Sequence, residues 1–231
     1  MKKRKTLLAL CSLALVAALA VGGTLAYLTD TTEATKNNFT VGKVEITVEE
    51  EWEEPTEPLK PGDEKEKEPS IKTTDDSEES YVFMMVTMPY VANGTVLNAD
   101  GTKNETLSGE KVDYFDLLEL DTANWQLVIS DKTPTVDGKN VYVYAYATSA
   151  GMTRLGKGSS TGSLFKKIKL RNIIELAPNG KESIDITGYA IQADNIKDAD
   201  GNEVTAPQTV WEYVLNQKAL EPAKTEPTPG A

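Results

Sequence analysis

The chain has 231 residues and is strongly acidic, with 36 Asp and Glu against 24 Lys and Arg, a formal net charge of −12 and no histidine. A surface of this charge repels nucleic acid and anionic lipid headgroups, so neither is expected as a partner of the folded domain. The lack of histidine removes the usual imidazole ligands of zinc peptidases and the usual base of nucleophilic triads.

Residues 1–26 have the pattern of an export signal. Four cations near the N-terminus precede an apolar run over residues 7–21, and the small residues Thr24 and Ala26 follow it. The run is shorter than the ~20 residues that span a bilayer comfortably, and Thr24 and Ala26 suit the pockets of a signal peptidase. We predict an N-terminal signal helix that is cleaved between Ala26 and Tyr27. An uncleaved signal helix, the alternative, would be the chain's one contact with a membrane.

Cleavage at this position would change the composition of the exported chain. The one cysteine, Cys11, would leave with the leader, so no disulfide could form. The leader carries four positive charges and no acidic ones, so the formal charge would move from −12 to −16. About 205 residues would remain, enough for one β-domain with a proper core. No cofactor or metal is expected.

Two stretches around the predicted cleavage site resemble a known family. They are residues 22–30, GGTLAYLTD, and residues 38–46, NFTVGKVEI. Both are similar to the signal class cut by the ER-type signal peptidase SipW of Gram-positive bacteria, whose cargo is the TasA/camelysin family. The resemblance is looser over residues 81–87 and 186–194. It implies an exported jelly-roll-like β-sandwich of the kind found in biofilm matrix fibres, and one branch of the family carries a metallopeptidase label.

The first part of the mature chain holds one strand and one charged tract. Residues 27–48 are polar until Val44, Ile46 and Val48 alternate with polar residues, which predicts a half-buried strand. Residues 49–80 form an acidic, proline-rich tract predicted to be a mobile loop or an extended surface segment. The resemblance places a turn at residues 59–63 and a short pairing strand after it. A calcium-binding or partner-binding arm is the alternative.

The core of the predicted sandwich lies in residues 81–220. Residues 81–88 are almost all apolar, which indicates a central strand covered on both faces. Residues 125–129 and 141–148 form a predicted hairpin. In its second arm Tyr142, Tyr144 and Tyr146 share one face, which predicts either a ladder against the core or a platform for sugar or peptide. We favour the ladder.

The remaining segments give three further expectations. Residues 112–120 form a short helix or a buried loop, and residues 164–174 form a strand with exposed cations that either blunts a sheet edge or docks the acidic tract. Residues 183–193 predict a late core strand, and 198–203 a turn in preference to a calcium site. A short helix follows Thr205, and residues 221–231 are expected to be a disordered tail.

These patterns predict a mainly antiparallel all-β protein, a jelly-roll-like sandwich with one or two short helices, exported to the surface or surroundings of a Gram-positive bacterium. We predict no catalytic residues and no metal ligands, and therefore no enzyme. The expected function is a structural matrix subunit or accessory that assembles by strand donation after signal cleavage, with a SipW-type peptidase, itself and matrix proteins as partners. A camelysin-like metallopeptidase and a surface adhesin are the alternatives.

Overall fold

The computed structural model describes residues 43–136, 139–176 and 182–216, apart from the side chains of 131–136 and 195, and these residues belong to one compact unit. The elements of the first half are β1 (Ile46–Glu51), β2 (Glu64–Glu66), β3 (Glu68–Thr73), β4 (Ser80–Met88), β5 (Tyr90–Gly94), β6 (Gly109–Asp113) and β7 (Phe115–Leu118). Those of the second half are β8 (Trp125–Val136), β9 (Lys139–Thr148), β10 (Gly151–Met152), β11 (Lys167–Leu170), β12 (Asp185–Gln192), η1 (Ala193–Asn195) and α2 (Pro207–Asn216).

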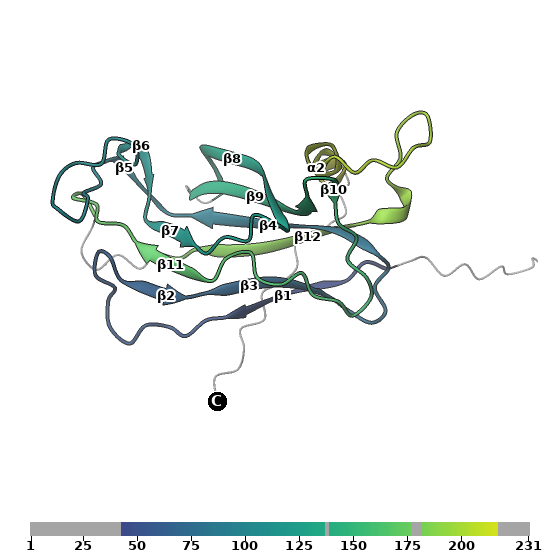
Figure 1. The fold of residues 1–231 in the computed structure, drawn as a ribbon, viewed down its shortest axis with the longest axis horizontal. Helices are drawn as coiled ribbons and strands as arrows, with labels where there is room; N and C mark the ends of the chain where they lie inside the picture. Colours follow the sequence, from purple (N-terminus) through teal and green to yellow (C-terminus); the bar gives the residue numbers. More distant parts are fainter. Residues whose placement is uncertain (1–42, 137–138, 177–181, 217–231) are drawn as a thin grey trace, which may run out of the picture. The chain divides into compact units, whose positions relative to one another are not determined.

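The larger layer is an antiparallel sheet in which β4 lies between β9 and β12, while β8 and β10 pair with β9. Figure 1 shows this layer above the second layer. The apolar run predicted as a central strand is β4, and both its neighbours pair with it antiparallel. The predicted hairpin is β8 and β9, and the predicted late strand is β12.

The second layer contains β1 paired with β3, and β11 between β2 and β7. Backbone hydrogen bonds join these two small sheets, because Leu164 N donates to Pro69 O at 2.9 Å and Lys67 N donates to Lys166 O at 3.0 Å. The strand predicted within residues 164–174 is therefore an inner strand of this layer, and not an edge.

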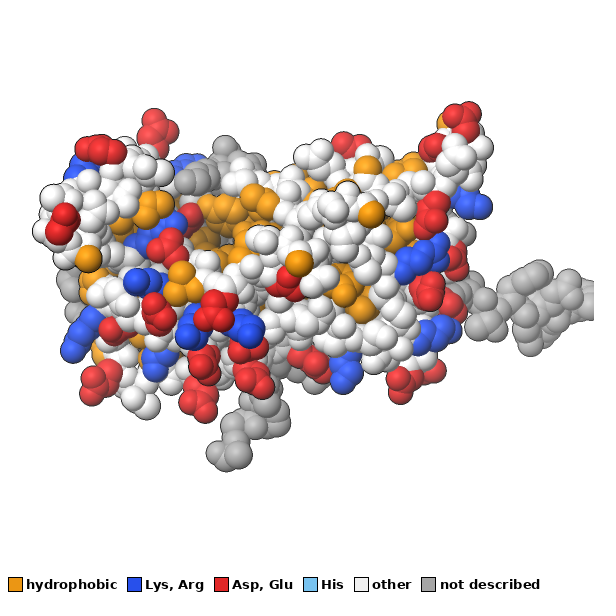
Figure 2. Space-filling view, viewed as in Figure 1, with side chains coloured by type: hydrophobic (Ala, Val, Ile, Leu, Met, Phe, Trp, Pro, Cys, Tyr) orange, Lys and Arg blue, Asp and Glu red, His pale blue; other side chains and the backbone are white. Residues whose placement is uncertain are grey.

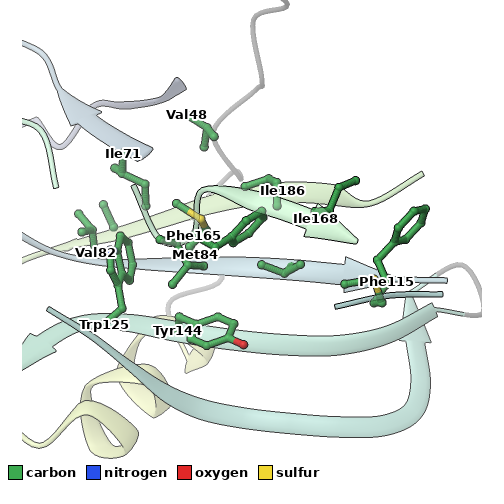
Figure 3. Packing of buried hydrophobic residues seen from close by; sticks show 14 of the residues in the cluster. Val48, Ile71, Val82, Met84, Phe115, Trp125, Tyr144, Phe165, Ile168 and Ile186 are labelled. Atoms are coloured by element: carbon green, nitrogen blue, oxygen red, sulfur yellow. The ribbon is translucent and has the colours of Figure 1, made fainter. Parts of the chain in front are cut away.

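Two apolar clusters cover the two faces of β4. The first lies between the layers and includes Val82, Met84 and Val86 of β4 with Phe165 and Ile168 of the second layer (Figure 3). The second lies on the other face, where Phe83 packs against Trp211 of α2 at a centroid distance of 5.1 Å. The helix predicted after Thr205 is α2, and its buried residues are Val210, Trp211 and Val214.

The predicted all-β class is confirmed: the described residues form mainly antiparallel sheets with one short α-helix. None of the described helices is long and apolar enough to cross a membrane. The predicted signal helix and the tail 221–231 lie outside the described residues.

The acidic tract is more ordered than the sequence predicted. It contains β2 and β3, and Ile71 of β3 is fully buried. Lys67, only 5% exposed, forms an ion pair with Glu50 and lies 4.8 Å from the ring centroid of Trp52. The burial of Ile71 and the ion pair of Lys67 offset the repulsion between the acidic side chains of this tract. Composition alone suggested that this repulsion would prevent folding. The predicted turn and the strand after it are present.

Residues 112–120 were predicted to be a helix or a loop, and this prediction is wrong. They contain the end of β6 and all of β7, separated by Tyr114. The local sequence gives no clear period-two pattern. The extended conformation is decided by pairing, of β6 with β5 and of β7 with β11, about fifty residues further along the chain. β5 and β6 close over a third small cluster that includes Val91, Val112 and Ile173.

Candidate functional site

The predicted tyrosine face points between the two layers. Tyr144 belongs to the first apolar cluster and is 7% exposed, while Tyr142 and Tyr146 pack against the same cluster half-buried. Their neighbours Val141 and Val143 belong to the second cluster, on the opposite face. The three rings therefore serve mainly as packing groups.

Two of these tyrosines also make specific contacts. The Tyr142 hydroxyl donates to Asp113 Oδ2 at 2.7 Å, and Asn140 Nδ2 donates to Asp113 Oδ1 at 2.7 Å. Arg171 lies close to the same carboxylate, with Nη1 3.9 Å from Asp113 Oδ2. Tyr146 meets Trp125 edge to face, with ring centroids 5.4 Å apart. This buried network joins β6, β9 and the residue that follows β11.

Titration of the buried tyrosines predicts alkaline unfolding. Burial is the main cause that raises the pKa of Tyr144 to about 12, and burial with the Glu203 hydrogen bond raises that of Tyr81 to about 12, from an ordinary 10.0. Because the folded pKa is the higher one, this stability is complete below pH 10 and is lost as the pH rises toward 12 and above. For Tyr144 alone the loss approaches roughly 2–3 kcal/mol.

The measurement is the free energy of unfolding in denaturant at stepped pH, together with tyrosinate absorbance of the folded protein. Tyr144→Phe should retain its stability further into alkali than the parent does, since it has no hydroxyl to ionise there. Normal titration of all tyrosines near pH 10 without any loss of stability would contradict the assignment.

One face of the hairpin is incompletely covered. Leu127 of β8 pairs in register with Tyr144, so it faces the second layer, yet it is 52% exposed. Figure 2 shows hydrophobic side chains reaching the surface in a hollow near β8 and β9. This leaves a small apolar surface beside the tyrosine face.

The basic strand holds the acidic tract within the same molecule. β11 pairs with β2 so that Lys167 lies opposite Glu66 and Lys169 opposite Glu64, with 3.9 Å between Lys169 Nζ and Glu64 Oε1. On the other side Lys167 lies 3.5 Å from Glu119. Exposed pairs are individually weak, so here they set which strands pair more than they stabilise the fold.

Arg154 is the centre of a second charged network. Its guanidinium lies 3.2 Å from Glu79, 2.5 Å from Asp194 and 2.7 Å from Glu203, and thus connects the residue before β4, η1 and the segment before α2. The hydrogen bond from the Tyr81 hydroxyl, followed by that from Arg154, holds the pKa of Glu203 below its usual range. The single charge of Arg154 therefore compensates part of the negative charge of these three carboxylates.

A zinc peptidase site does not fit the donor groups of this chain. The sequence has no histidine and its one cysteine is Cys11. Among the described residues no three Asp, Glu or Cys side chains are grouped to hold a metal ion. The loop at Asp198 is a turn, in which the Asp198 carboxylate accepts the backbone N–H of Asp200 and Asn202 at 2.9 and 2.8 Å.

The edges of the sheets are a further surface, and sequence reasoning did not locate them. Among the strands that the structure describes, β12 ends the larger layer, where it pairs with β4. Gly188 of β12 lies so close to the second layer that an added Cβ would be 2.9 Å from Val48 Cγ2 and 3.2 Å from Ile46 Cδ1. The isolated glycine in a strand pattern was the signal of such a close approach. The predicted cleavage residues Thr24, Ala26 and Tyr27 lie outside the described residues.

The fold defines the class of this protein as an all-β sandwich. Among the described residues, no group of side chains is arranged to hold a metal ion. Residues 1–112 match the model of a family described as camelysin metallo-endopeptidase. This match covers slightly less than half of the chain and agrees with the resemblance of its N-terminal sequence to TasA/camelysin proteins.

Two other comparisons add little. The search of curated proteins found no match. The chain is similar to the crystal structure of the second type II cohesin module from the cellulosomal adaptor ScaA scaffoldin of Acetivibrio cellulolyticus, with 9% identity, 73% of this chain and 92% of that chain covered, and a TM-score of 0.24. A likeness at this level carries no argument about function.

Proposed function

We propose that this protein is an exported structural protein of a Gram-positive cell surface or extracellular matrix, which self-associates by strand donation once its leader is removed. The observation that carries the proposal is a sandwich whose larger layer ends, among the described strands, in β12, which pairs on one side with β4. The chain before β1 is long enough to complete such an edge in another copy. Main-chain hydrogen bonds to an exposed edge are a general mode of association.

The structure shortens the donor segment that the sequence suggested. Residues 27 to about 46 were expected to be available, but Val44 and Ile46 pack against the first cluster and Ile46 pairs with Thr73 of β3. Lys43 O also accepts a hydrogen bond from Glu78 N at 2.8 Å. The donor that we propose is therefore limited to residues 27–42.

The family description supports a second candidate, a secreted metallo-endopeptidase. The donor groups argue against zinc, as described above, so only a site built from carboxylates would remain. Hydrolysis of casein by the purified protein, abolished by a chelator and restored by a metal, would establish this candidate in place of the structural one.

The proposal is tested by comparing the exported, leader-processed chain with a variant that lacks residues 27–40. Size-exclusion chromatography and negative-stain microscopy should show oligomers or filaments for the first and a monomer for the second. Monomers for both under all conditions would remove the basis of strand donation and would favour a binding module instead. Equal assembly of both would show that the segment is not the donor.

A further inference from the structure

The basic strand β11 has two neighbours that hold it in different ways. On one side lies β7, and on the other lies β2 of the acidic tract (Figure 1). We infer that the side of β11 facing β2 is a docking site for an extended acidic segment of a partner protein, and that β2 occupies this site as an internal stand-in. This inference goes beyond the proposed function and does not depend on self-association.

The β7 side of β11 is held by buried side chains. Phe115 lies opposite Leu170 and Leu117 lies opposite Ile168. All four side chains belong to the first apolar cluster or pack against it. Separating β7 from β11 would therefore open the core between the layers, at a high cost in free energy.

The β2 side is held mainly by the backbone. Residues 60–66 are all exposed, so this stretch adds no buried side chain to the core. Leu170 N donates to Asp63 O at 3.0 Å, while Lys169 Nζ lies 3.9 Å from Glu64 Oε1. An exposed ion pair of this length is weak. Segments with few buried contacts open locally while the rest of the fold stays intact.

The segment lies between two anchors that are better buried than it is. Before it, Leu59 packs against the first cluster. After it, Lys67 is 5% exposed and forms an ion pair with Glu50. Residues 60–66 can therefore lift away from β11 while the chain stays attached at both ends. Lifting would leave the backbone groups of β11 open to another strand.

The charges of β11 select for acidic residues at alternate positions of that strand. Lys167 and Lys169 are two residues apart, so they lie on one face of the sheet. In β2 they are opposite Glu66 and Glu64. Opposite charges at such positions favour strand pairing, and like charges oppose it. Main-chain hydrogen bonds would supply the affinity, as in other cases of strand addition.

β2 itself fits this site poorly at its middle position. Lys65 lies opposite Ile168, which is 4% exposed and belongs to the first cluster. Residues directly opposite each other share a face of the sheet, so a charged side chain occupies a place beside the apolar core. A strand with an apolar residue there would bury it against Ile168. The site therefore favours the pattern acidic–apolar–acidic over the Glu-Lys-Glu of the chain itself.

Amide hydrogen exchange measured by NMR tests whether β2 is weakly held. The Leu170 amide donates to β2, whereas the next amide along, that of Arg171, donates to Tyr114 O at 2.8 Å on the β7 side. We expect Leu170 to exchange at least about tenfold faster than Arg171 after correction for intrinsic rates. Salt at about 1 M, which screens the ion pairs, should accelerate Leu170 alone. Equal exchange of both amides, unaffected by salt, would contradict a weakly held β2.

A labelled peptide tests the docking site. The probe is Gly-Asp-Glu-Ile-Glu-Lys, which is residues 62–67 with isoleucine in the middle position, and binding is followed by fluorescence anisotropy. Glu64→Lys with Glu66→Lys places lysine opposite lysine, so this full-length variant should bind the probe at least about tenfold more tightly than the unaltered chain, whose own β2 competes. Glu53→Lys with Glu57→Lys makes the same charge change outside the strands and should bind like the unaltered chain. Circular dichroism checks that both variants remain folded.

The possible results distinguish the occupants. Tight binding of the probe together with slower exchange of the Leu170 amide supports the site. Absence of binding to the folded Glu64→Lys, Glu66→Lys variant overturns it, as does equal binding of a probe with lysine in place of both glutamates. Dimers of the unaltered chain that exchange β2 between copies, and that this variant cannot form, would make a second copy the occupant in place of a partner protein. None of these results bears on strand donation by residues 27–42.

Discussion

Phe83→Ala lowers the free energy of unfolding by about 3–5 kcal/mol. Phe83 has no exposed surface and lies on β4, in the centre of the larger layer, where its ring packs on Trp211. Removing the ring leaves a cavity between the sheet and α2, and a sheet held in register on both sides cannot move inward to fill it. Chemical denaturation followed by far-ultraviolet circular dichroism measures the change.

Leu127→Ala is the matched control for this result. Leu127 lies in the neighbouring hairpin but is 52% exposed, so its removal takes away little buried surface. We expect a loss below about 1 kcal/mol. Equal effects of the two substitutions would show that the second cluster is not a tightly packed core.

Asp113→Ala should destabilise the protein by about 3–5 kcal/mol, as expected when one member of a buried charged network is removed. Asp113 is 7% exposed and accepts hydrogen bonds from Asn140 and Tyr142. Without this carboxylate, the fully buried amide of Asn140 loses its hydrogen-bond acceptor. The positive charge of Arg171 is then paired with Asp116 and no longer with Asp113. Denaturant unfolding measures the loss.

Asp100→Ala controls for the loss of a carboxylate as such. Asp100 lies in an exposed turn and its carboxylate accepts hydrogen bonds only from Thr102. The expected change is within about 1 kcal/mol. If Asp113→Ala is as mild as this control, the network around Asp113 does not hold β6 to the larger layer.

Strand periodicity was the most dependable guide to the fold. The apolar run at β4, the alternation in β9 and the spacing of Val210, Trp211 and Val214 in α2 each report a surface that the segment must bury, so they are visible in a single sequence. The prediction was wrong at β7 and incomplete at β2, where short strands have little apolar content of their own. Their conformation is decided by β11, a strand about fifty to a hundred residues away.

The amino-acid sequence by itself determined the donor groups and the charge: a chain without histidine lacks the usual imidazole ligands of a zinc peptidase centre, and its formal net charge is −12. The tertiary structure alone decided that the acidic tract docks on the basic strand, that Asp113 meets Tyr142, and that β12 lies at the end of the larger sheet among the described strands. Composition and periodicity are local properties, whereas an edge is defined by the absence of a neighbour, and neighbours are chosen by contacts between segments far apart in the chain.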